Sequence, residues 1–102
     1  MARPQATRFS RGNVVRGTIY DFHAGGDVLD VHTHDTQTNH TTIVTNGVLE
    51  VIGNNANTGR KITAGDIVDW TAGEPHGFKA ITPARIVNLL INSTRMDDGY
   101  DA

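Results

Sequence analysis

Residues 26–47 read GDVLDVHTHDTQTNHTTIVTNG and place His32, His34 and His40 between two glycines. Side chains of a β-strand alternate between its faces, so the His32-Thr33-His34 pair shares one face if this segment is extended. Two neutral imidazoles on one face can approach the same ion at roughly 2.0 to 2.1 Å. A metal site is therefore our leading hypothesis. An isolated His-x-His pair is equally consistent with exposed polar residues in a turn-rich segment.

A second segment supplies a fourth histidine. Residues 65–76 read GDIVDWTAGEPH, which predicts a short apolar strand, a tight turn and then His76. If His40 and His76 both point inward, strand parity predicts that Thr42, Val44, Phe78 and Ala80 do so too. The remaining histidine, His23, lies outside both segments, and we interpret it as structural or as a support for the ligands.

The first segment resembles the first motif of the cupin superfamily, which reads Gly, five residues, His-x-His, three or four residues, Glu, six residues, Gly. Gly26, His32, His34 and Gly47 fall on its positions. His40 takes the place of the glutamate, with one extra residue in the gap.

The second segment resembles the second cupin motif, which reads Gly, five residues, Pro-x-Gly-x-x-His, three residues, Asn. Gly65, Gly73 and His76 match it, whereas Thr71 replaces the proline and Ala80 replaces the asparagine. The two resemblances together span about residues 14–92. They imply an all-β fold, the double-stranded β-helix or cupin jelly-roll barrel, with a divalent metal held inside it by His32, His34, His40 and His76.

The identity of the metal stays open, because imidazole ligands suit Fe, Ni, Zn, Mn and Cu. The role of His40 also stays open. Either it completes a four-histidine site, or the extra residue turns it away and leaves three histidines.

Neutral imidazoles leave the charge of a divalent cation uncompensated, so the site should favour a small anionic, oxygen-bearing organic molecule. The resemblance implies a metal-dependent enzyme, either dioxygenase-type or a lyase or isomerase. The alternative is a non-catalytic, metal-stabilised module that binds a small ligand. A third hypothesis, a purely structural jelly roll without metal, is the least favoured, because it treats the alignment of the four histidines as a coincidence. The candidate catalytic residues are Tyr20, Glu50 and Arg85, with Asp35 and Glu74 as further possible bases.

The pattern along the chain is one of short strands and turns without helical periodicity. We predict strands over 14–23, 28–32, 41–45, 48–53, 67–70, 76–81 and 85–92, a hairpin loop over 54–59 and a turn over 64–66. Phe78 is expected in the core, and Trp70 is expected either there or at the rim of the pocket.

Composition fits a single globular domain, since the chain has 102 residues, of which 37% are hydrophobic and 20% charged. We divide it into an N-terminal arm over 1–13, flexible or exchanged with a partner subunit, a cupin domain over 14–94 and an acidic tail over 95–102. The resemblance also implies a homodimer.

Several classes of function are disfavoured. The net charge of −2 and the lack of a basic run argue against nucleic acid binding. No apolar run approaches the roughly 20 residues that span a bilayer, so no membrane association is expected. The N-terminus lacks a secretory signal, from which we expect a cytoplasmic protein. The absence of cysteine excludes disulfide and thiolate chemistry.

Overall fold

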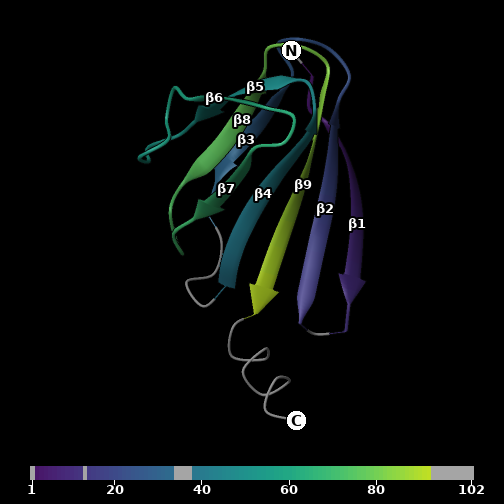
Figure 1. Cartoon of the computed structure of the whole chain (residues 1–102), viewed down its shortest axis with the longest axis vertical. Helices are drawn as coiled ribbons and strands as arrows, with labels where there is room; N and C mark the ends of the chain where they lie inside the picture. The colour runs from purple at the N-terminus through teal and green to yellow at the C-terminus, as the bar shows by residue number, and fades with distance from the viewer. Residues whose placement is uncertain (1, 13, 34–37, 93–102) are drawn as a thin grey trace.

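The computed structural model describes residues 2–12, 14–33 and 38–92, which form two antiparallel sheets packed face to face (Figure 1). The five-stranded sheet has the order β1 (Gln5–Arg11), β2 (Val15–Phe22), β9 (Ala84–Asn92), β4 (Thr38–Asn46) and β7 (Ile67–Trp70). The four-stranded sheet has the order β3 (Val28–His32), β8 (His76–Ala80), β5 (Val48–Ile52) and β6 (Lys61–Thr63).

The core lies between the two sheets, and alternation along each strand supplies it. Thr42 and Val44 of β4 are buried, as are Phe78 and Ala80 of β8, which confirms the predicted parity. The buried apolar residues are Phe22, Val44, Leu49, Val51, Ile62, Val68, Trp70, Phe78, Ala80, Ala84 and Ile86.

The predicted strands and turns are confirmed within one to three residues at their ends. Two strands were missed. The sequence of β1 has no apolar alternation, because none of its residues packs into the core and all of them are exposed. β1 is a strand because it pairs with β2. The second, β6, has three residues, too few to show a period. Most of the expected N-terminal arm is thus a strand of the same chain.

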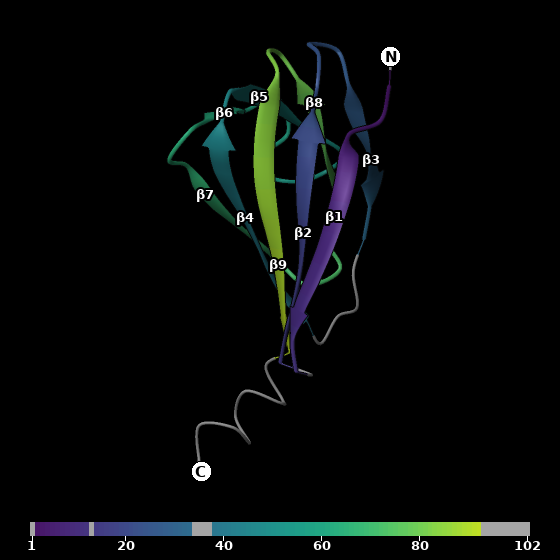
Figure 2. The ribbon, with the colours of Figure 1, turned by 90° about the vertical axis from the view of Figure 1, so that its right-hand side faces the viewer.

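β1, β2, β9 and β4 continue beyond one end of the four-stranded sheet, which packs against the concave face of the five-stranded sheet (Figure 2). β9 and β4 have nine residues each, whereas β3, β8 and β5 have five. His32 ends β3 and its register partner His76 begins β8, so both lie at this end of the four-stranded sheet.

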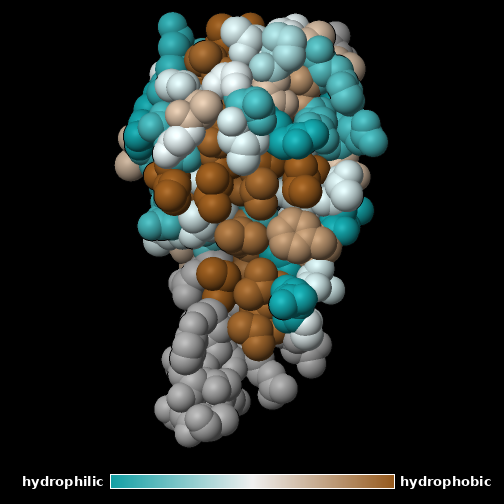
Figure 3. Space-filling model, turned by 45° about the vertical axis from the view of Figure 1, so that its right-hand side comes forward, coloured by the Kyte–Doolittle hydropathy of each residue, from teal (hydrophilic) through white to brown (hydrophobic). Residues whose placement is uncertain are grey.

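An apolar patch covers the centre of the outer face of the five-stranded sheet (Figure 3). Ile67 and Phe9 are 62% and 39% exposed, and the Phe9 ring lies over Gly17. Further apolar side chains on this face are half-buried, namely Val15, Ile19, Ile43, Val87, Leu89 and Ile91. Contiguous exposed apolar surface is typical of protein interfaces. The homodimer itself stays a prediction.

No helix within the described part of the chain is long and apolar enough to cross a membrane.

Candidate metal centre

His32 and His76 face each other on neighbouring strands of the four-stranded sheet. They are register partners of β3 and β8, and their ring centroids lie 4.8 Å apart in an edge-to-face arrangement. His76 is 1% exposed, whereas His32 is half-buried. The pair therefore reaches from the barrel interior to its surface.

A bulge in β3 turns His32 toward the interior. Leu29 lies opposite Phe78 and His32 lies opposite His76, so Asp30 and Val31 together face one residue of β8. Residues three apart on a regular strand point to opposite faces, and the extra residue of a bulge reverses this. Leu29 and His32 consequently both point inward, while Val31 is exposed.

The one residue opposite the bulge is Gly77, where the two backbones approach closely. A Cβ atom there would lie 2.6 Å from the Leu29 carbonyl oxygen and 2.9 Å from the Val31 nitrogen. Glycine at this position is therefore a condition for the His32–His76 pair.

The turn before His76 is held by its own hydrogen bonds. The Glu74 carboxylate accepts the Thr71 backbone N–H at 3.0 Å, and the Asn55 side-chain amide donates to the Pro75 carbonyl at 2.8 Å. The Glu74 carboxylate, one of the possible bases, thus caps the turn that presents the histidine.

Both histidines of the pair have the same tautomer. Nδ1 of His32 lies 2.8 Å from the carbonyl oxygen of Asp30, and Nδ1 of His76 lies 2.9 Å from that of Glu74. A carbonyl oxygen can only accept, so each Nδ1 is the donor, and the lone pair of the neutral ring lies on Nε2. Metal-ligating histidines are commonly oriented by such a bond.

A third ring comes from the opposite sheet. His40 of β4 is 3% exposed, and its ring centroid lies 4.6 Å from that of His76. Histidines of both sheets thus meet at one end of the barrel. This confirms that His40 points inward despite the extra residue before it.

Trp70 fixes the position of His76. The two rings are stacked, with centroids 4.5 Å apart and planes 12° from parallel. The Trp70 indole N–H donates to the Thr42 hydroxyl at 2.9 Å, and that hydroxyl donates to Asn88 Oδ1 at 2.6 Å. All three side chains are buried. We call Trp70, Thr42 and Asn88 the buried relay.

Sequence reasoning placed Thr42 inward but missed the relay. The available signal was Asn88, a polar residue at an inward position between the apolar Ile86 and Leu90 of the same strand face.

His34, the fourth predicted ligand, lies outside the described residues, as does Asp35. Within residues 2–12, 14–33 and 38–92, no three His, Cys, Asp or Glu side chains form a group that could hold a metal ion. The four-histidine set stays a prediction, because the described histidines supply only part of it.

Solved structures with the same architecture include an RmlC-like cupin protein from Desulfovibrio desulfuricans, with 19% identity, a TM-score of 0.78 and coverage of 88% of this chain and 83% of that one. The chain has the cupin fold. A double-stranded β-helix protein from Klebsiella pneumoniae gives 24% identity, a TM-score of 0.75 and coverage of 88% and 77%. KdgF from Halomonas sp. has 20% identity and a TM-score of 0.73, and the match covers 86% of this chain and 79% of KdgF. No family model matches the sequence, and no curated protein matches it.

The cupin barrel places the three catalytic candidates differently. Tyr20 lines a groove together with His32 and Arg3, and Arg3 is paired with Asp30 at 3.2 Å. Glu50 lies between the inward-facing Leu49 and Val51 and so faces the outside of the barrel.

Arg85 lies at the other end of β9 from Leu90, the register partner of His40. Its guanidinium is bonded to Asp21 at 2.6 Å. His23 is exposed and lies 3.2 Å from the Gln5 side-chain oxygen. Of the three candidates, only Tyr20 shares a surface with a histidine of the centre.

Proposed function

We propose that this cupin barrel binds one divalent metal ion through His32, His34, His40 and His76 and presents it to a small anionic, oxygen-bearing organic molecule. The observation that carries the proposal is the shared tautomer of His32 and His76, whose Nδ1 atoms each donate to the backbone carbonyl two residues earlier in the chain. This leaves Nε2 as the coordinating atom of both rings.

The surroundings fit such a centre. The ring of His40 adjoins His76 from the other sheet, and Trp70 stacks on His76. Apolar neighbours such as Phe78 and Leu29 limit the access of water to the buried side of the rings. Histidine donors suit a borderline divalent cation, which polarises bound oxygen groups and makes bound water more acidic.

We further propose that the protein is an enzyme of dioxygenase, lyase or isomerase type. His32 is half-buried and opens onto a groove that also holds Tyr20 and Arg3, so a ligand can reach the centre from outside. Tyr20 is our candidate for exchanging a proton with the ligand, and Arg3 would attract its negative charge. The alternative is a non-catalytic module that binds the same kind of ligand.

Elemental analysis of protein purified without an affinity tag tests the metal site. We expect about one divalent ion per chain and its loss in His32→Ala and His76→Ala. His40→Ala decides between a four-histidine and a three-histidine site. The control is His23→Ala, because His23 is exposed and bonded to Gln5. Full occupancy in His76→Ala would contradict the proposal.

Turnover separates the enzyme from the binding module. The metal-loaded protein is incubated with hydroxy acids, keto acids and diketones, with and without oxygen, and products are followed by mass spectrometry. Product that depends on the metal supports the enzyme. Saturable binding without product under both conditions would establish the alternative.

A further inference from the structure

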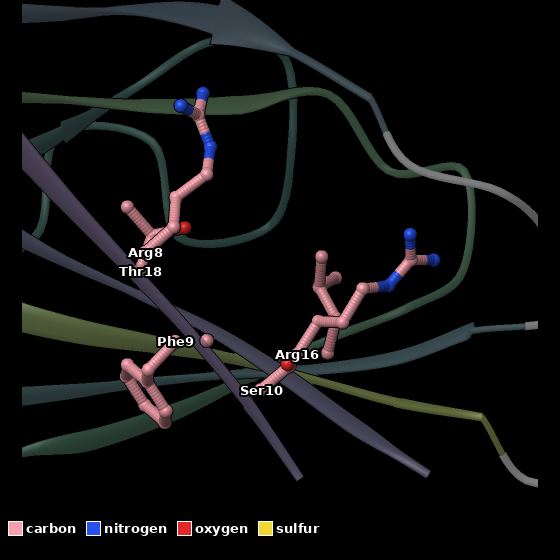
Figure 4. Close-up of a pocket in the computed structure, with 7 residues that line it drawn as sticks. Arg8, Phe9, Ser10, Arg16 and Thr18 are labelled. Carbon is pink, nitrogen blue, oxygen red and sulfur yellow. The ribbon is translucent and has the colours of Figure 1, made fainter. Parts of the chain in front are cut away.

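The concave face of the five-stranded sheet continues past the histidines into a hollow with a volume of about 520 Å³ (Figure 4). The side chains that matter for its chemistry come from β1, β2 and β9. They are Arg8, Ser10, Arg16, Thr18 and Leu90. Two of the five are cations and two carry hydroxyl groups.

The hollow adjoins the histidines through the register of the sheet. Leu90 of β9 is the partner of both His40 on β4 and Arg16 on β2. His40 and Arg16 therefore lie in one row of the concave face, two strands apart. Two inter-strand spacings correspond to about 9 to 10 Å between their backbones.

Arg8 and Arg16 lie on the same side of the sheet. Tyr20 and Phe22 of β2 pack against the core, so Thr18 and Arg16 share their face by alternation. Arg8 is opposite Thr18, which makes it the diagonal neighbour of Arg16. In Figure 4 both arginines extend to one side of the ribbon and Phe9 extends to the other.

The two guanidinium groups are available for a ligand. Both residues are exposed, and the ion pairs between described residues use Arg3 and Arg85 instead. Like charges on neighbouring strands repel each other, and an anion bound between them removes this repulsion. Arginine in particular binds carboxylates through two parallel hydrogen bonds.

We propose that Arg8 and Arg16 bind a distal carboxylate of the ligand, whose other, oxygen-bearing end lies at the histidines. The Ser10 and Thr18 hydroxyls supply further hydrogen bonds to this carboxylate. The inference rests on the proposed function and narrows its ligand to a small organic diacid. The row geometry fits a chain of about four to six carbons, once the lengths of the metal and arginine contacts are subtracted.

Calorimetric titration of cobalt(II)-loaded protein with two acids of equal length tests the subsite. 2-Hydroxyglutarate has the distal carboxylate, and 2-hydroxypentanoate lacks it. We expect the wild-type protein to bind the diacid at least about tenfold more tightly. The double variant Arg8→Gln, Arg16→Gln should bind both acids equally while keeping its cobalt.

Arg11→Gln is the matched control. It removes the same charge from the same strand, but Arg11 is opposite Val15 and points to the outer face. This variant should keep the preference for the diacid. A wild-type protein without preference, or a double variant that retains it, would overturn the proposal.

The failure of the metal site would be visible separately, as the absence of bound cobalt in the wild-type protein. The subsite is then tested by titrating glutarate into metal-free protein and following amide NMR shifts. Saturable shifts at Arg8, Ser10, Arg16 and Thr18 that disappear in the double variant would support it. Unchanged amide shifts in the wild-type protein would refute it.

Discussion

Replacing Thr42 by valine tests how the interior of the barrel positions His76. The substitution keeps the shape of the side chain and removes one hydroxyl. That hydroxyl accepts the Trp70 indole N–H at 2.9 Å and donates to Asn88 Oδ1 at 2.6 Å. Trp70 in turn stacks on His76. Thr42→Val therefore breaks the buried relay at its centre.

The size of the effect follows from burial. Thr42, Trp70 and Asn88 are all buried, so water cannot replace the lost hydroxyl as a partner of the Trp70 N–H or of Asn88 Oδ1 unless the core rearranges. A buried polar group that loses its hydrogen bond costs about 1 to 3 kcal/mol. Two such groups give an expected loss of about 2 to 4 kcal/mol in the free energy of unfolding, allowing for some relaxation of Asn88. This is a large part of the stability of a small domain.

Urea denaturation followed by tryptophan fluorescence measures this loss, because Trp70 is the only tryptophan of the chain. The control is Thr41→Val, which removes the neighbouring hydroxyl that donates to Asp69 at an exposed position. It should cost less than about 1 kcal/mol. Metal affinity should fall roughly tenfold or more in Thr42→Val alone. Equal losses of stability in the two variants would refute the role assigned to the buried relay.

Three further predictions concern the bulge, the far end of the barrel and the outer face. Gly77→Ala should lower the free energy of unfolding by about 2 kcal/mol or more and weaken metal binding, because the added Cβ would lie 2.6 Å from the Leu29 carbonyl oxygen. An unchanged melting temperature would contradict this close approach of the two backbones. Arg85→Gln should leave the metal content unchanged and lower the free energy of unfolding by less than about 1 kcal/mol, since Arg85 pairs with Asp21 at the end of β9 remote from His40. Loss of metal in this variant would argue against that placement. Leu89→Lys should convert the expected homodimer into a monomer in sedimentation experiments, because Leu89 lies in the centre of the apolar patch on the outer face. A wild-type protein that sediments as a monomer would show that the homodimer prediction is wrong.

The alternation along the strands and the Gly, Asn and Pro residues of the turns were sufficient to predict the strands, whereas the barrel was predicted from the resemblance of the two histidine motifs to those of cupins. The inward orientation of Thr42, Val44, Phe78 and Ala80 followed from parity, given that His40 and His76 point inward. β1 was missed because it is a strand through its pairing with β2, and its sequence carries no apolar pattern.

The geometry around the histidines was less accessible to sequence reasoning. The bulge that turns His32 inward depends on the register between β3 and β8, which a single strand does not encode. The stacking of Trp70 on His76 joins residues of different sheets. Both features arise from packing between segments, so neither has a local signature.

The most direct test of the metal centre is a crystal structure of the cobalt(II)-loaded protein with anomalous scattering measured at the cobalt edge. We predict one peak within about 2.0 to 2.2 Å of Nε2 of both His32 and His76, with each Nδ1 still bonded to its backbone carbonyl. A peak coordinated through either Nδ1, or a cobalt ion bound away from both rings, would contradict it.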